Sequence, residues 1–349
     1  MPANITPSGN GPDATSQPGS WMIYGAAGYT GTLIARHARD RGHRPVLAGR
    51  SAPAVAVLAE QLGLRHQAAA LDDPAALTAA LEGVDLVLNA AGPFLHTAAP
   101  LAEACLRAGV HYLDIGNELQ AFRALYDLDQ RARQAGVTIM PGAGFGVVAT
   151  NCLARYVSDA VGGATMLEVA SRAAVAQTGP GVAASRSENM PFGGWIRQAG
   201  HLRSLPLGSG IITITFPDGP CNVMPLPTGD LEAAFQATGA ADITAYAAVP
   251  GAPSSQAIDT DAAALPAYRS YGWARATGPD GTAEAWLHTG ESYAFTAAAS
   301  IRAVEETLAR SPSGAVSPAA AFGADFALTI PGTSRTDTIP SEVPAGSEA

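Results

Sequence analysis

Between residues 21 and 140, short apolar runs alternate with stretches whose apolar residues recur at helical spacing. The runs predict strands at Trp21–Tyr24, Pro45–Ala48, Arg65–Ala69, Leu86–Asn89, His111–Ile115 and Thr138–Met140. The stretches predict helices at Thr30–Arg41, Ala54–Gly63, Pro74–Leu81, Ala98–Ala108 and Leu119–Ala135. Such alternation indicates an α/β fold, in which helices cover both faces of a parallel sheet.

A glycine ends or directly follows each predicted helix, or lies within two residues of its end: Gly42, Gly63, Gly83, Gly109 and Gly136. Glycine adopts the left-handed backbone conformation that commonly terminates a helix. The glycines therefore support a doubly wound parallel sheet of Rossmann type.

The pattern changes after about residue 150. A helix over Val147–Ala160 leads out of the first half, and a late helix is expected at Ile301–Arg310. Gly/Pro turns, among them Gly179-Pro180-Gly181 and Gly278-Pro279-Asp280-Gly281, separate apolar runs, and the second of these turns predicts a hairpin. The runs predict strands at Met166–Ala170, Ile211–Phe216, Thr282–Leu287 and Tyr293–Ala299. We expect a second α/β domain built on a mostly antiparallel sheet.

The length of 349 residues fits two domains, at about 150 residues each. We expect a disordered tail over residues 1–20, a Rossmann domain over 21–150 and a substrate and dimerisation domain over 151–300. Residues 301–335 are expected to return to the first domain. The polar chain after Gly332 is expected to fray, with a flexible tail at 336–349.

Charge and cysteine content exclude several classes of protein. The net charge is −10 and no block of basic residues occurs, so binding to nucleic acid or to an anionic membrane is not expected. No apolar run of about 18 residues is present to span a membrane. Three widely spaced cysteines argue against a disulfide framework and a structural zinc site, and they favour a reducing cytoplasm. No metal site is predicted.

The first predicted strand runs into Gly25-Ala26-Ala27-Gly28-Tyr29-Thr30-Gly31, directly before a helix. The glycines permit a tight turn and a close approach of the backbone to a pyrophosphate, whose charge the helix amino terminus stabilises. Alone, such a triplet could be only a tight turn. Its position at the first strand of a βαβ unit predicts a dinucleotide site, with Tyr29 shaping the cleft.

Arg50 follows the second strand, about 20 residues past the last loop glycine, where NAD-binding proteins place an acidic residue. An arginine can bind a ribose 2′-phosphate, so NADP is favoured over NAD. The alternative is a solvated surface arginine. Small residues after the fourth strand leave room for the cofactor. The predicted cofactor residues are Gly25, Ala27, Gly28, Tyr29, Thr30, Gly31, Arg50, Ser51, Asn89, Ala90, Gly92 and Pro93.

Five motifs occur in order: Gly25–Gly31, Leu47–Ser51, Leu88–Phe94, His111–Ile115 and Met140–Gly146. Together they resemble the saccharopine dehydrogenase-like family, which includes the trans-acting enoyl reductases. The likeness continues into Gly193–Trp195, Leu205–Gly208 and Pro227–Asp230. It implies an NADP-binding Rossmann domain, a second α/β domain and frequently a homodimer. It assigns cofactor roles to Gly25, Gly28, Gly31, Arg50 and Gly92. Some members of the family reduce C=N bonds and others C=C bonds.

Candidate catalytic residues should lie at the carboxyl ends of strands four to six. Asp114 ends the fifth strand and Glu118 follows it; either carboxyl could hold the substrate or deliver a proton. His96 follows the Gly-Pro-Phe turn and titrates near neutrality. The alternatives without a catalytic role are a strand-end or capping aspartate for Asp114, a first-turn helical glutamate for Glu118 and a surface or capping histidine for His96.

The second half offers substrate-binding candidates. Arg186 could pair with a carboxylate or phosphate, and Trp195 could wall an apolar group. The alternative for this stretch is a surface loop and the start of an amphipathic helix, which we favour for Arg197. Motifs for zinc hydrolases, P-loop enzymes, serine hydrolases and the Tyr/Lys reductases are absent from the sequence.

These patterns predict an NADPH-dependent oxidoreductase that delivers hydride to a C=N or C=C bond of a small metabolite. The rival is a non-catalytic NADP-binding sensor or scaffold of NmrA-like type, since a fold alone does not define a function. A polar cavity at the nicotinamide position would favour the enzyme.

Overall fold

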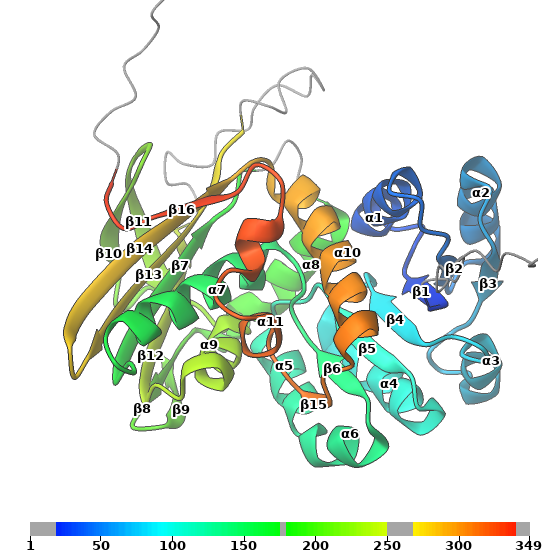
Figure 1. Cartoon of the computed structure of the whole chain (residues 1–349), viewed down its shortest axis with the longest axis horizontal. Helices are drawn as coiled ribbons and strands as arrows, with labels where there is room; N and C mark the ends of the chain where they lie inside the picture. The colour runs from blue at the N-terminus through cyan, green and yellow to red at the C-terminus, as the bar shows by residue number, and fades with distance from the viewer. Residues whose placement is uncertain (1–18, 175–178, 250–267, 340–349) are drawn as a thin grey trace, which may run out of the picture.

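A computed structural model describes residues 19–174, 179–249 and 268–339 of the chain, and it contains two β-sheets (Figure 1). The predicted tail residues 1–18 and 340–349 lie outside the described residues. In Figure 1 the smaller sheet and its helices, in blue and cyan, lie on the right, and the larger sheet lies on the left. Within the described residues, no helix is long and apolar enough to cross a bilayer.

The first sheet is parallel, with the strand order β15-β6-β5-β4-β1-β2-β3. Its strands are β1 (Trp21–Tyr24), β2 (Val46–Gly49), β3 (His66–Ala68), β4 (Leu86–Asn89), β5 (His111–Asp114), β6 (Thr138–Met140) and β15 (Gly314–Ala315). The order reverses between β1 and β4, which is where open α/β sheets bind their ligands. The prediction of a Rossmann-type α/β sheet is confirmed.

The helices of the first half are α1 (Tyr29–Asp40), α2 (Ala52–Leu62), α3 (Pro74–Ala80), α4 (Phe94–Ala108), α5 (Leu119–Tyr126) and α6 (Asp129–Ala135). All five glycines predicted at helix ends have a left-handed φ, between +65° at Gly63 and +87° at Gly42. The single helix predicted over Leu119–Ala135 is wrong. The chain turns at Asp127 and Leu128, and the Asp129 carboxylate then accepts a hydrogen bond from the Ala315 N–H of β15 (2.9 Å).

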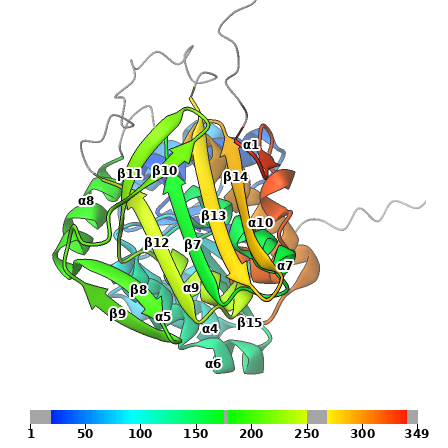
Figure 2. The ribbon, with the colours of Figure 1, turned by 90° about the vertical axis from the view of Figure 1, so that its left-hand side faces the viewer.

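The second sheet is mixed and mostly antiparallel, as predicted, with β7 and β12 as its parallel pair (Figure 2). Its order is β10-β11-β12-β7-β13-β14-β16, and the β8–β9 hairpin branches from β12. The strands are β7 (Met166–Arg172), β8 (Gly194–Gln198), β9 (His201–Leu205), β10 (Ile212–Phe216), β11 (Gly219–Pro225), β12 (Asp242–Ala248), β13 (Ser270–Gly278), β14 (Gly281–Thr289) and β16 (Ser334–Thr336). The predicted hairpin turn is confirmed, because Gly278 pairs with Gly281.

Among the described residues, the elements that accompany the second sheet before β15 are α7 (Phe145–Ala160), α8 (Pro180–Asn189), the 3₁₀ turn η1 (Met190–Phe192), α9 (Asp230–Thr238) and α10 (Ser292–Arg310). After β15, the chain forms α11 (Pro318–Phe322) and η3 (Phe326–Thr329) and then returns to the second sheet as β16. The C-terminal segment therefore contributes a strand to each sheet. The fraying expected after Gly332 is wrong for residues 334–336, which pair with β14.

The predicted strand Tyr293–Ala299 is wrong, because these residues form the first turns of α10. The helix lies between the two halves and is apolar on several sides, so the apolar run carries no helical period. The Glu291 carboxylate caps it by accepting from the Ala294 N–H (2.8 Å). The predicted Gly179-Pro180-Gly181 turn is likewise replaced by the start of α8, where proline is well tolerated.

The prediction that Arg197 lies in a surface loop or at a helix start is wrong. Arg197 belongs to β8, its side chain is buried, and its Nη2 lies 2.8 Å from Glu232 Oε2 on α9. The guanidinium also stacks over the Phe235 ring, 4.0 Å from the ring centroid. This pairing supplies the opposite charge that a buried arginine needs.

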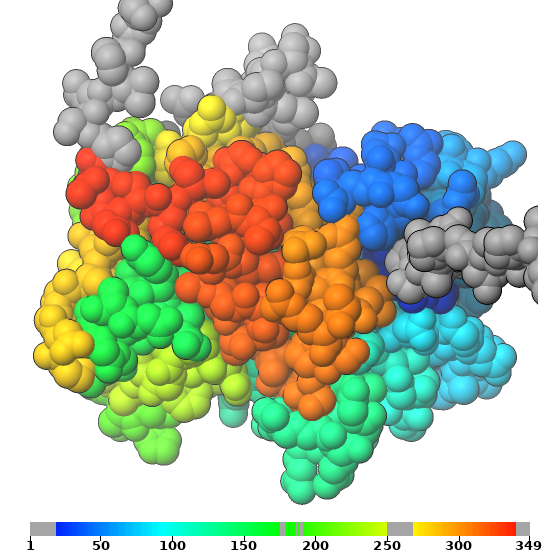
Figure 3. Space-filling model, viewed as in Figure 1, coloured from blue at the N-terminus to red at the C-terminus, as the bar shows by residue number. Residues whose placement is uncertain are grey.

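One apolar core connects both sheets. It includes Ile23 and Leu47 of the first sheet, Leu167 and Ile243 of the second, and the facing sides of α7 and α10. Figure 3 shows the orange α10 and the red segment after it between the two halves. The second sheet is curved on its far face, where the Trp286 indole on β14 donates a hydrogen bond to the Thr215 carbonyl on β10 (3.1 Å). The two halves are thus packed as one body.

Candidate functional site

The fold brings the three predicted cofactor segments together at the carboxyl ends of the strands of the first sheet. Strands β2, β1 and β4 are neighbours, with Tyr24 in register with Ala48 and with Asn89. Their carboxyl ends lead into the glycine loop, into Arg50 and Ser51, and into the loop from Ala90 to Pro93. Residues separated by 65 positions in the sequence therefore form one crevice at the point of strand-order reversal.

Two glycines of the loop are required by close packing. Gly25 has φ +80°, and a Cβ there would lie 2.6 Å from the Ala91 backbone nitrogen. A Cβ on Gly31 would lie 2.2 Å from the Gly25 carbonyl oxygen. Both distances are shorter than any van der Waals contact, so these positions hold the first loop against the β4 loop and the first helical turn.

Helix α1 begins directly after this loop with an amino terminus suited to an anion. Its N-cap residue, Gly28, has no side chain to accept a hydrogen bond, and its first turn contains no acidic residue. The first N–H groups of a helix have no acceptor within the helix. The positive end of the helix dipole therefore faces the crevice, where phosphate oxygens are the expected partners.

Arg50 extends from the end of β2 into solvent. Among the residues described by the structure, it has neither a hydrogen bond nor an ion pair with another side chain. An exposed guanidinium at this position can form two parallel hydrogen bonds to a phosphate. Its role at the 2′-phosphate stays a prediction.

Asn89 and Asp114 belong to a buried hydrogen-bond network next to the crevice. The Asn89 amide donates to the Tyr112 hydroxyl (3.1 Å), which donates to Asp114 Oδ2 (2.9 Å). The other Asp114 oxygen, Oδ1, accepts from the Gly116 and Gly142 N–H groups (2.9 Å each). Burial raises the pKa of Asp114 to about 6, although these hydrogen bonds oppose the shift. Asp114 thus joins the loops after β5 and β6.

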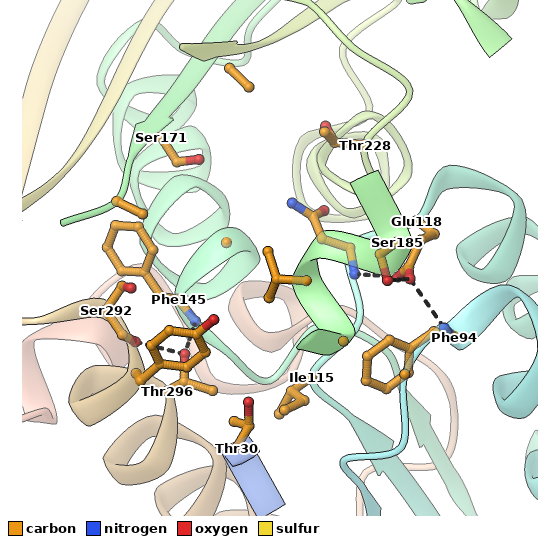
Figure 4. Close-up of a pocket in the computed structure, with 18 of the residues that line it drawn as sticks. Thr30, Phe94, Ile115, Glu118, Phe145, Ser171, Ser185, Thr228, Ser292 and Thr296 are labelled. Carbon is orange, nitrogen blue, oxygen red and sulfur yellow. Dashed lines mark hydrogen bonds between the residues drawn. The ribbon is translucent and has the colours of Figure 1, made fainter. Parts of the chain in front are cut away.

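A cavity of about 360 Å³ opens beside this crevice, between the two sheets (Figure 4). Thr30 of α1 lies at one end, and Ser171 of β7 and Thr228 lie toward the other (Figure 4). Phe94 and Phe145 form aromatic walls. The volume and the mixture of apolar walls with a few polar groups are typical of small-molecule sites.

Glu118 is the predicted catalytic candidate that lines this cavity. It is 4% exposed, and its Oε1 accepts from the Phe94 N–H (3.1 Å) and the Ser185 hydroxyl (2.6 Å). Its Oε2 accepts from the Asn117 N–H (3.0 Å). In each of these three contacts the Glu118 carboxyl oxygen is the acceptor. Glu118 therefore connects the loop after β4, the loop after β5 and helix α8.

The other candidates lie elsewhere. Asp114 and His96 are not among the described residues that line the cavity; the His96 ring is exposed and pairs with Glu188 on α8 (2.9 Å). Trp195 is also absent from the described lining, and its indole donates to the Phe192 carbonyl (3.0 Å). The Arg186 side chain lies outside the described residues.

Several cavity residues were not predicted individually: Asn117, Phe145, Ser171, Ser185, Thr228, Ser292, Tyr293 and Thr296. Asn117 and Phe145 lie within or beside motifs that the sequence analysis singled out. Tyr293 and Thr296 were missed because they lie in the run that was wrongly predicted as a strand. The Tyr293 ring contacts Tyr29 edge-on, with centroids 4.9 Å apart, and so closes the cavity beside the glycine loop.

Comparison with known proteins shows what the first half of the chain is similar to. Residues 21–140 match the saccharopine dehydrogenase NADP binding domain. A trans-acting enoyl reductase of Mycobacterium ulcerans is 32% identical over 132 residues, which is 36% of this chain and 32% of the relative. The corresponding protein of Mycobacterium leprae is 33% identical over the same length. The chain thus matches about a third of the length of these curated relatives.

The likeness in fold extends further than the likeness in sequence. Saccharopine dehydrogenase (L-Glu forming) from Saccharomyces cerevisiae superposes with a TM-score of 0.59 at 13% identity, covering 89% of this chain and 96% of the other. Proteins with this α/β fold commonly bind a dinucleotide where the strand order reverses. Within this chain, residues 21–140 resemble the saccharopine dehydrogenase NADP binding domain, and the chain is distantly similar to the trans-acting enoyl reductases. The resemblance predicted from the motifs is confirmed.

Proposed function

We propose that this protein is an NADPH-dependent oxidoreductase that reduces a C=N or C=C bond of a small molecule. The observation that carries the proposal is the cavity of about 360 Å³, which runs from the helix α1 amino terminus to the second sheet. A non-catalytic NADP sensor needs the crevice but has no use for a walled cavity beside the reactive end of the cofactor.

The residues present fit the cofactor. The glycine loop and the start of α1 would hold the pyrophosphate, and Arg50 and Ser51 would hold the 2′-phosphate. Ala90 and Gly92 line the cavity and leave room for the nicotinamide ribose. NADPH supplies a hydride when it is bound.

The chain's own residues orient the substrate and exclude water. Phe94, Phe145 and Leu226 wall the cavity, and its hydroxyl groups can bind a polar atom of the substrate. Helices α7 and α8 begin at the wall with no acidic residue in their first turns. Their N–H groups can stabilise negative charge that develops during reduction. Glu118 holds three wall segments together. The candidate proton donors of this proposal are Glu118, Asp114 and His96.

Titration with NADPH and NADH tests the cofactor assignment. We expect NADPH to bind at least about tenfold more tightly than NADH, because hydrogen bonds to a charged group contribute about 1.5 kcal/mol or more and the arginine–phosphate contact is bidentate. Arg50→Ala should remove that preference and leave NADH binding within about threefold. Arg65→Ala is the matched control, since Arg65 is exposed directly before the amino end of the neighbouring strand β3, away from the carboxyl ends that form the crevice. Unchanged NADPH affinity in Arg50→Ala would refute the assignment.

A further inference from the structure

The charge of the cavity wall narrows the class of substrate, if the proposed function is correct in locating the substrate there. No arginine, lysine or histidine is found among the lining residues that the structure describes. The chain contains no lysine at all, and all seven of its histidines lie in the described ranges. Arg186 is the only cationic side chain whose position is not described. A substrate carboxylate or phosphate would therefore lack an ion-pair partner at every described wall position.

The charged side chain that does line the cavity has the opposite sign. Glu118 is buried, and its carboxylate lies at the wall beside Phe94 and Ser185 (Figure 4). A second anion in the same low-dielectric space would be repelled. Two backbone N–H groups and the Ser185 hydroxyl, all of them parts of the wall, donate to Glu118, so the carboxylate cannot turn away without breaking these three hydrogen bonds.

The helix amino termini do not reverse this balance. A helix end carries a partial charge only, and the Phe145 N–H at the start of α7 is already bonded to the Thr296 hydroxyl (3.1 Å). Removing a whole carboxylate from water costs more than one or two such termini return. Partial charges suit a charge that develops during the reaction, whereas a permanent anion needs a full counter-charge.

We infer that the cavity accepts an uncharged, mainly apolar substrate and excludes one that carries a free carboxylate or phosphate at its reacting end. Hydroxyl groups at Ser171, Thr228, Ser292 and Thr296 provide neutral hydrogen-bonding positions around the apolar walls (Figure 4). The substrate would be an ester, amide, ketone or similar neutral compound.

Matched acid and ester pairs test the inference. The probes are trans-cinnamate with methyl trans-cinnamate, and trans-2-octenoate with its methyl ester, titrated by calorimetry at neutral pH into protein saturated with 1,4,5,6-tetrahydro-NADP, a hydride-inactive analogue whose nicotinamide ring is uncharged, as in NADPH. We expect each ester to bind at least tenfold more tightly than its acid. The same preference should hold in Arg186→Gln, the variant that removes the one cation of undescribed position.

Ala247→Phe shows whether binding occurs in the cavity. Ala247 pairs with Ser171 in the sheet and lines the end away from Thr30. The bulkier ring should weaken ester binding at least tenfold and leave NADPH binding intact, which separates this inference from the cofactor assignment. Equal or tighter binding of the acids overturns the inference, as does an acid preference lost in Arg186→Gln. Failure of both esters to bind at millimolar concentration, or ester binding unaffected by Ala247→Phe, overturns it too.

Discussion

At the scale of single residues, the glycine loop is determined by contacts that leave no space for a side chain. Gly25 combines a left-handed φ with a backbone neighbour that a Cβ would approach to 2.6 Å. Because that neighbour is the Ala91 backbone, it cannot rotate away as a side chain would. The loop after β1 and the loop after β4 are therefore positioned by each other.

Gly25→Ala should lower NADPH affinity by at least about tenfold, equivalent to 1.4 kcal/mol, because the two loops must separate. Gly42→Ala is the control: Gly42 also has a left-handed φ, of +87°, but nothing lies within 4 Å of its added Cβ. That variant should lose about 1 kcal/mol of stability and keep its NADPH affinity. Isothermal titration of both proteins makes the comparison. Equal affinities in the two variants would contradict the role of the close contact.

Asp114 makes stability depend on pH in a defined direction. Its pKa is about 6 in the folded protein and near 3.9 in an unfolded chain. The folded state therefore binds more protons between these values, and the contribution of Asp114 to stability falls as the pH rises from about 4 to about 6. Above that range its ionised form is retained at a cost.

Asp114→Asn should abolish this part of the pH dependence. Relative to the wild type, the variant should gain stability between about pH 4 and pH 6, by about 3 kcal/mol. The Asn oxygen can still accept from the Gly116 and Gly142 N–H groups, so the loops stay joined. Urea unfolding at several pH values measures the difference. A difference between the proteins that is constant with pH would exclude the assigned titration.

At the scale of elements, helix α8 is held on the first domain by side chains at two points. Ser185 donates to Glu118, and Glu188 pairs with His96. Both partners come from loops or helices beside the cofactor crevice. The position of α8 over the cavity thus depends on a few polar contacts, in contrast to the apolar burial that holds α7 and α10.

Ser185→Ala should loosen α8 without unfolding the protein. Loss of a hydrogen bond to a buried carboxylate corresponds to roughly 1.5 kcal/mol, so amide hydrogen exchange over residues 180–189 should speed up about tenfold. Ser187→Ala provides the control, because Ser187 is exposed on the same helix. Exchange rates in α8 that match those of the control would show that the Ser185–Glu118 contact does not hold the helix.

At the scale of the whole molecule, both sheets share one apolar core. Helices α7 and α10 present buried residues to each sheet, and the C-terminal segment adds β15 to the first sheet and β16 to the second. Neither half has its core complete without the elements between them. This arrangement fixes the cavity, since its walls come from both halves.

The shared core predicts that the two sheets unfold together. Pulse-labelling hydrogen exchange during urea unfolding should give the same midpoint for β1 in the first sheet and for β7 in the second, because the largest apolar cluster joins both sheets through α7 and α10. Midpoints that differ by more than the error of the measurement would show two independent units and remove the structural basis for a fixed cavity.

The sequence by itself determined the first sheet, the glycine loop and the position of Arg50. These features depend on local signals: alternating apolar runs, glycines at helix ends and a fixed spacing along one βαβ unit. Such signals act over a few residues, and they survive without knowledge of what packs against them.

The predicted helix over Ile301–Arg310 is confirmed as the second half of α10. Tertiary structure alone decided the first turns of α10, the turn between α5 and α6, the burial of Arg197 and the membership of the cavity wall. A run buried on all sides loses its helical period, so the residues from Tyr293 to Ala299 predict a strand as readily as a helix. The cavity joins Thr30, Glu118, Ser171 and Ser292, which come from distant parts of the chain. Their proximity is a property of the packing between the two sheets, and no local pattern records it.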